Sequence, residues 1–156
     1  MKKCKLEDID LFHVTNKSAL TSIEKDGLKP DLSELTQECW IRNQVSSRGL
    51  DEYDDDVMES LEKEASKLPE FVFAAEGEND LLVALYQINK NALAPTPLSE
   101  ILVLGITDDC AKQFKSEEIG SDIDMVSRKP VPPNCICLID EKEWKPKYLQ
   151  KQRKIV

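Results

Sequence analysis

The sequence is poor in the residues on which many enzyme and metal sites depend. It has one histidine, His13, and its five cysteines form no Cys-x-x-Cys pair, so a zinc site lacks its usual ligands. The sequences Gly-x-Gly-x-x-Gly, Gly-Lys-Ser/Thr and Gly-x-Ser-x-Gly are also missing. We therefore predict no bound metal, and we exclude the common dinucleotide-fold, P-loop and serine-hydrolase motifs.

Long apolar runs are missing too. No stretch approaches the roughly 20 apolar residues that cross a bilayer, and the first residues carry positive charge without the apolar run of a signal peptide. The odd number of cysteines favours reduced thiols. We expect a cytoplasmic protein that does not bind a membrane.

The charge is strongly unbalanced. The 156 residues include 30 acidic and 21 basic side chains, for a net charge of −9, which makes nucleic acid a less expected partner because the field of the protein repels polyanions. The length fits one domain. We predict a single domain over residues 1–150 and a basic C-terminal tail over residues 151–156, whereas the oligomeric state stays open.

Apolar periodicity predicts a small α+β domain. The run at residues 100–106 is almost continuously apolar, which is typical of a strand in the middle of a sheet. Strands are expected at residues 10–15, 71–75, 100–106, 123–127 and 135–139, helices at residues 17–26, 55–67, 80–88 and 108–114, a short helix around residues 32–40 and a loop at residues 46–49. Helices and strands lack the regular alternation of a doubly wound sheet, which favours the α+β class.

One segment resembles a known family. Residues 11–16 read Leu-Phe-His-Val-Thr-Asn, and a predicted helix then leads to Gly-Leu-Lys-Pro at residues 27–30. This pattern is similar to the opening of ADP-ribosyltransferase-like domains, a superfamily that includes bacterial toxins, DNA-modifying enzymes and RNA 2'-phosphotransferases. Residues 71–75 and the Val-Pro-Pro-Asn-Cys-Ile sequence at residues 131–136 are compatible with two later segments of that superfamily.

The resemblance implies a fold and a chemistry. The fold would be a short-stranded, mostly antiparallel sheet, continuous or split, flanked by helices. The activity would be an NAD-dependent mono-ADP-ribosyltransferase, a glycosyltransferase acting as a toxin or effector on a protein or small-molecule acceptor. NAD would be the co-substrate.

The same resemblance assigns candidate residues. His13 and Thr15 would bind the nicotinamide-side ribose, because a neutral imidazole and a hydroxyl can both donate and accept hydrogen bonds. Phe73 would stack on nicotinamide. Arg42 or Arg48 would pair with the pyrophosphate. Glu76, directly after the second strand, is the candidate catalytic carboxylate.

The sequence leaves a second interpretation open. Alanines occupy positions 74 and 75, where the family has polar residues, and the third-segment glutamate that orients the ribose in the family is not identifiable. The alternative is a catalytically altered or inactive acidic interaction protein, a phage or bacterial modulator that binds a basic partner through the carboxylates of residues 51–56 and 59–64. His13 and Phe73 would then be structural and both arginines solvated. The transferase interpretation requires His13, Phe73 and a carboxylate to converge on one cleft.

Overall fold

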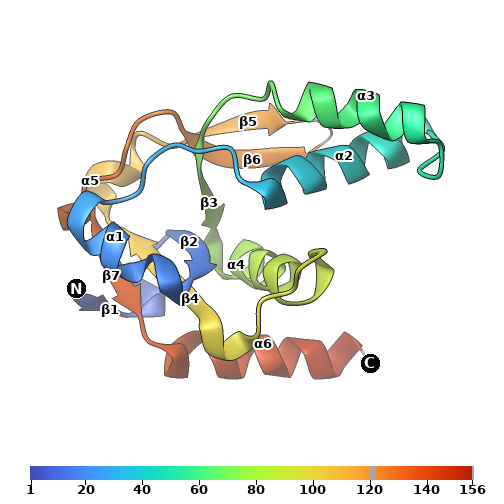
Figure 1. The fold of residues 1–156 in the computed structure, drawn as a ribbon. Helices are drawn as coiled ribbons and strands as arrows, with labels where there is room; N and C mark the ends of the chain where they lie inside the picture. Colours follow the sequence, from blue (N-terminus) through green and yellow to red (C-terminus); the bar gives the residue numbers. More distant parts are fainter. Residues whose placement is uncertain (120–121, 156) are drawn as a thin grey trace.

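The chain folds around a mixed seven-stranded sheet in the order β1-β7-β4-β2-β3-β6-β5 (Figure 1). This computed structural model describes residues 1–119 and 122–155. In that part of the chain β1 and β7 are parallel, and every other neighbouring pair is antiparallel. The strands are β1 (Lys3–Cys4), β2 (Leu11–Asn16), β3 (Val72–Glu76), β4 (Ile101–Ile106), β5 (Lys115–Ile119), β6 (Asp122–Ser127) and β7 (Ile136–Ile139). The predicted α+β class and the mostly antiparallel sheet are confirmed.

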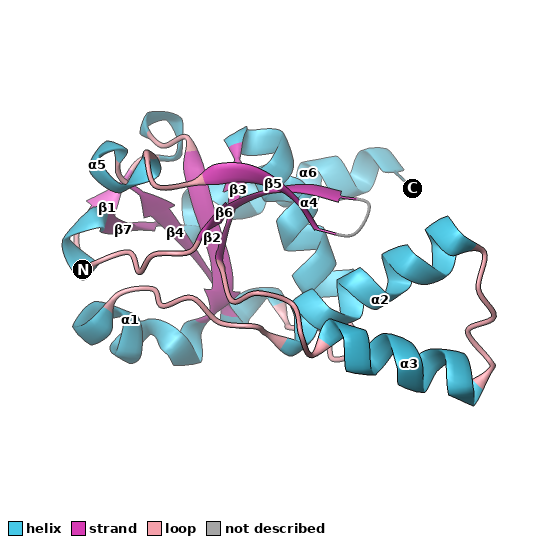
Figure 2. Cartoon of the chain, turned by 90° about the horizontal axis from the view of Figure 1, so that it is seen from above, coloured by secondary structure: helices cyan, strands magenta, loops and turns pink. Residues whose placement is uncertain are grey.

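The described part of the chain also contains six α-helices (Figure 2). They are α1 (Leu20–Asp26), α2 (Glu34–Arg48), α3 (Asp55–Ala65), α4 (Gly77–Tyr86), α5 (Asp108–Ala111) and α6 (Glu141–Ile155). A π-helical turn, Gln87–Asn91, extends α4, and four short 3-10 turns lie at Leu6–Asp8, Lys17–Ala19, Leu98–Glu100 and Pro133–Cys135. None of the described helices is long and apolar enough to cross a membrane.

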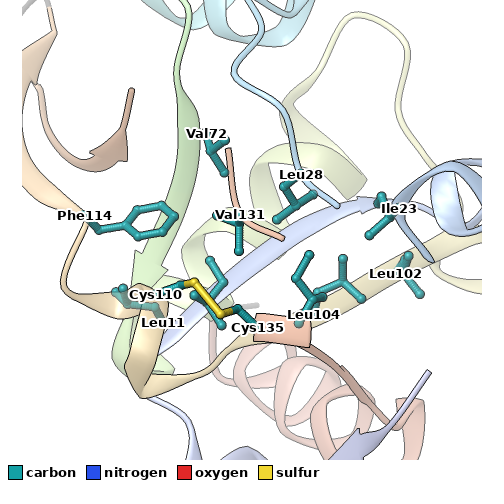
Figure 3. Close-up of a cluster of buried hydrophobic side chains, with 12 residues drawn as sticks. Leu11, Ile23, Leu28, Val72, Leu102, Leu104, Cys110, Phe114, Val131 and Cys135 are labelled. Atoms are coloured by element: carbon teal, nitrogen blue, oxygen red, sulfur yellow. A yellow bond between two sulfur atoms is a disulfide. The ribbon is translucent and has the colours of Figure 1, made fainter. Parts of the chain in front are cut away.

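β4 lies inside the sheet, as its apolar sequence predicts. All six of its residues are buried, and β2 and β7 pair with it on either side. Leu102 and Leu104 belong to a first core cluster that also includes Ile23 of α1 (Figure 3). Ile101 and Val103 face a second cluster, which is completed by α4 and α6. Because both faces of β4 are covered, the strand needs apolar residues at every position.

The helices α2 and α3 form a hairpin that projects beyond the sheet (Figures 1 and 2). We call residues 33–68 the arm. It has a small core of its own, in which Trp40, Leu61 and Ala65 are buried. The loop predicted at residues 46–49 is wrong: residues 46–48 are the last turn of α2, which ends at Arg48 and is capped by Gly49, with φ of 62°.

Three elements were not expected. β5 is charged, reading Lys-Ser-Glu-Glu-Ile, and β1 is only two residues long. Helix α6 has little apolar pattern to predict it: among the side chains of residues 141–153, the large ones that are almost fully buried are Trp144 and Tyr148, at 1% exposure each. The predicted tail at residues 151–156 begins inside this helix, which continues through Ile155, while Val156 lies outside the described residues.

The prediction of reduced thiols is wrong for four of the five cysteines. Disulfides join Cys4 to Cys137 and Cys110 to Cys135, with Cα–Cα distances of 5.7 and 6.0 Å. The second bond lies inside the first core cluster (Figure 3). Disulfides are typical of oxidising compartments. The expectation of a cytoplasmic location therefore loses the support that it drew from reduced thiols.

Candidate functional site

Strand β2 carries His13 and Thr15 to the place where the sheet divides. Leu11 and Phe12 pair with Glu76 and Ala75 of β3, but the pairing stops there, and β3 continues beside β6 from Ala74 back to Val72. His13 is thus the first residue of β2 beyond its ladder with β3, while it still pairs with Leu104 of β4. The sheet is continuous in strand order but opens between β2 and β3.

The imidazole of His13 spans this opening. Its Nδ1 lies 2.8 Å from the carbonyl oxygen of Phe73. A carbonyl only accepts hydrogen bonds, so Nδ1 must carry the proton and donate, which leaves Nε2 as an acceptor. Nε2 has no hydrogen-bond partner among the described residues.

Burial keeps this ring neutral. Desolvation lowers the pKa of His13 below its usual 6.5, and the opposing effects of the Phe73 carbonyl and of Asp31 are smaller. The side chain is half-buried. At neutral pH the site therefore offers a fixed, uncharged imidazole, which can accept a hydrogen bond through Nε2.

The register places three candidate residues on one face of the sheet. His13 and Thr15 lie opposite Leu104 and Leu102, which face the first core cluster. Glu76 lies opposite Leu11, another member of that cluster. Glu76 and His13 therefore lie on the same face, two residues apart along the register, with His13 beyond the end of the β2–β3 ladder. The carboxylate of Glu76 is exposed.

Phe73 does not join them. Val72 and Ala74 pack with the first cluster, so the ring of Phe73, between them, projects from the opposite face. It contacts Phe71 edge to face, with the ring centroids 5.8 Å apart. Phe73 reaches the site through its backbone carbonyl, and not through the stacking platform that the resemblance implies.

The two candidate arginines lie on the arm. Arg42 donates hydrogen bonds to the carboxylate of Glu38 and to the carbonyl oxygen of Asn91. Arg48 is 3.7 Å from Glu64, which pairs α2 with α3. Both guanidinium groups are therefore paired with residues within or beside the arm, and the structure does not bring them to His13.

The segment at residues 27–31 has a structural role that its sequence did not reveal. Gly27 has φ of 76°, and a Cβ atom there would lie 2.1 Å from the carbonyl oxygen of Val131. This close approach allows Leu28 to pair with Val131 and Asp31 to pair with Phe71. Asp31, which sequence analysis missed, is in this way held close enough to His13 to affect its pKa.

Two surface hollows lie elsewhere. One, of about 600 Å³, follows α6 and includes Lys145, Leu149 and Arg153. The other, of about 530 Å³, adjoins the Cys4–Cys137 disulfide. Neither is lined by a candidate residue, so the convergence of His13, Phe73 and a carboxylate in a cleft is not observed in either hollow.

No family model, no curated protein and no solved structure matches the chain.

Proposed function

We propose that the protein is an NAD-dependent mono-ADP-ribosyltransferase whose nicotinamide-side ribose binds at His13. The observation that carries this proposal is the neutral, oriented imidazole at the opening between β2 and β3. Its Nε2 can accept a hydrogen bond from a ribose hydroxyl, and the hydroxyl of Thr15, on the same face, can assist.

Glu76 is the proposed catalytic carboxylate. In the reaction the bond between C1' of the ribose and the nicotinamide nitrogen breaks, and nicotinamide leaves with the electron pair. A nucleophile of a protein or small-molecule acceptor then bonds to C1' and gives its proton to Glu76. A carboxylate beside the positively charged ribose also lowers the barrier by electrostatic stabilisation. The roles first assigned to Phe73, Arg42 and Arg48 are not part of this proposal.

NAD binding measured by calorimetry tests the proposal directly. We expect the wild type to bind NAD and His13→Ala to bind it at least tenfold more weakly, because an oriented hydrogen-bond acceptor is lost. Val14→Ala is the matched control, since Val14 neighbours His13 in the strand but packs against the second core cluster. Equal binding by His13→Ala and Val14→Ala, or no binding by the wild type, would rule out the site.

Glu76→Gln separates binding from chemistry. It should bind NAD like the wild type but lose NAD hydrolysis or transfer, both of which release nicotinamide. Nicotinamide release at the wild-type rate by Glu76→Gln would remove Glu76 from the mechanism.

A second candidate function rests on the arm. Its tip carries Tyr53, which is 85% exposed, within the acidic run of residues 51–56. A large exposed ring among carboxylates suits a basic protein partner, through charge attraction and aromatic contact. This function does not require His13.

Fluorescence anisotropy with a labelled lysine-rich peptide tests the arm. The variant Tyr53→Ala/Asp55→Asn/Asp56→Asn leaves the capping residue Asp54 in place, and we expect it to bind the peptide more weakly than the wild type while NAD binding is unchanged. A similar affinity in wild type and variant would exclude the arm as the interaction surface.

A further inference from the structure

Helix α6 presents a stripe of exposed side chains on the side that faces away from the sheet. Trp144 and Tyr148 turn inward to the second core cluster. Four residues at successive spacings of four, three and four share the outer side of the helix and line the hollow of about 600 Å³: Lys142, Pro146, Leu149 and Arg153. We call these four residues the α6 stripe. It has an apolar centre and a basic residue at each end.

The two cations of the α6 stripe form no ion pair in the part of the chain that the structure describes. Between them, Leu149 is one of the large apolar side chains that stay exposed, at 37%. Apolar surface with a cation on either side fits a segment that carries an aromatic ring between carboxylates, because both the charges and the apolar contacts are then matched.

The tip of the arm, residues 51–59, has this complementary arrangement. It contains six acidic residues and no basic one. All six carboxylates are exposed, and none of them forms an ion pair among the described residues. Tyr53, at 85% exposure, projects from the middle of the acidic run.

The tip cannot reach the α6 stripe of its own molecule. The arm and α6 lie at opposite sides of the sheet (Figure 1). A contact between the tip and the stripe therefore requires two molecules.

We infer that the α6 stripe is the docking surface for the arm tip of a second copy of this chain. Tyr53 packs on Pro146 and Leu149, and the acidic residues beside it pair with Lys142 and Arg153. This inference rests on the second candidate function and names the basic partner of the arm. Because tip and stripe are different surfaces, each docked copy still has one of each free, so copies join head to tail. A turn against one helix face is a small contact, so the association is reversible.

Sedimentation velocity over a series of protein concentrations tests the docking. At about 0.15 M salt, repulsion between the negative molecules is screened beyond roughly 8 Å, whereas charges in contact still attract. The sedimentation coefficient of the wild type should rise with concentration. Two charge reversals, Glu52→Lys/Glu59→Lys on the tip and Lys142→Glu/Arg153→Glu on the stripe, should each keep the protein monomeric, because like charges then meet. An equimolar mixture of both variants restores opposite charges at every contact and should associate like the wild type.

The control Lys25→Glu/Lys29→Glu changes the net charge by the same amount as the reversal of the stripe. Both lysines are exposed, and helix α1, which Lys25 belongs to, packs on the first core cluster and not on the second. This variant should associate like the wild type. Tyr53→Ala leaves the charge unchanged and should associate more weakly, because the aromatic contact is lost.

The outcomes separate the docking from the function of the arm. A wild type that stays monomeric over the whole series would overturn the inference, and so would a mixture of the two reversed variants that does not associate. Loss of association in Lys25→Glu/Lys29→Glu would assign the effect to net charge and would also overturn it. A monomeric wild type that binds the lysine-rich peptide through its arm would keep the second candidate function and overturn only the docking between copies.

Discussion

His13 shows what one residue reveals in sequence and what it does not. The sequence predicts that His13 lies on a short strand before a helix, and an imidazole is a side chain that can bind a ribose. The protonation state of His13 cannot be predicted in this way, because that depends on burial and on the carbonyl of Phe73, 60 residues away along the chain.

A nuclear magnetic resonance titration of the imidazole checks this state, and the single histidine makes the assignment unambiguous. We expect a pKa below 6.5, because desolvation disfavours the charged ring. The unfolded chain then binds the proton more readily than the folded one. The free energy of unfolding should therefore fall as the pH drops below 6.5, and it should fall less in His13→Gln. A titration midpoint above 6.5 would contradict the burial of the ring.

The other candidate residues differ in how far sequence could place them. Glu76 is the last residue of β3, so its location at the end of that strand was predictable to within one residue. The register with Leu11 adds that it shares the face of His13. The direction of the Phe73 ring required the register of β3 against β6. The contact of Arg128 with the Phe71 ring gave no signal in the sequence, because only strand pairing brings these two residues together.

At the scale of elements, apolar strands were predictable and polar or short ones were not. β4 and β7 stand out because they are buried on both faces or nearly so. β5 has a charged sequence and lies at the edge of the sheet, so it lacks the apolar pattern that makes β4 and β7 predictable. Helix α6 is mostly polar and contains Pro146, and the two aromatic residues that anchor it are four residues apart, a spacing too sparse to predict 15 residues of helix.

The contact of β4 with β1 and β7 leads to a prediction on Gly105. A Cβ atom at Gly105 would lie 2.9 Å from Cys137 Sγ and 3.0 Å from Cys4 Sγ. We expect Gly105→Ala to lower the free energy of unfolding by about 1–3 kcal/mol, measured by denaturant titration, because overpacking strains a buried strand.

A double-mutant cycle identifies the cause. In the background Cys4→Ala/Cys137→Ala the sulfur atoms are gone, so Gly105→Ala should cost clearly less there than in the wild type. An equal cost in both backgrounds would show that the disulfide does not set the size of residue 105.

At the scale of the whole molecule, charge is unevenly distributed. Residues 51–64 include eight acidic residues and one basic residue, whereas α6 is predominantly basic. The arm and α6 lie at opposite sides of the sheet (Figure 1). Net charge alone therefore describes neither surface, and the low expectation of a polyanionic partner applies to the arm more than to α6.

The arm should also be the least stable part of the molecule. Its core buries only three hydrophobic residues, against twelve in the first cluster of the sheet. We expect amide hydrogens of α2 and α3 to exchange with deuterium faster than those of β2 and β4 in native-state mass spectrometry. Equal protection of both regions would show that the arm unfolds only together with the sheet.

The two cysteines of the Cys4–Cys137 disulfide are synthesised far apart in time. A ribosome makes Cys4 first among the five cysteines of this sequence, and it then makes Cys39, Cys110 and Cys135 before Cys137, the partner of Cys4. During synthesis, every thiol available to Cys4 until that moment is a wrong one. A chain refolded from the full-length denatured state meets no such delay. Maturation in a cell therefore depends either on keeping Cys4 reduced until β7 is complete, or on a catalyst that exchanges premature bonds.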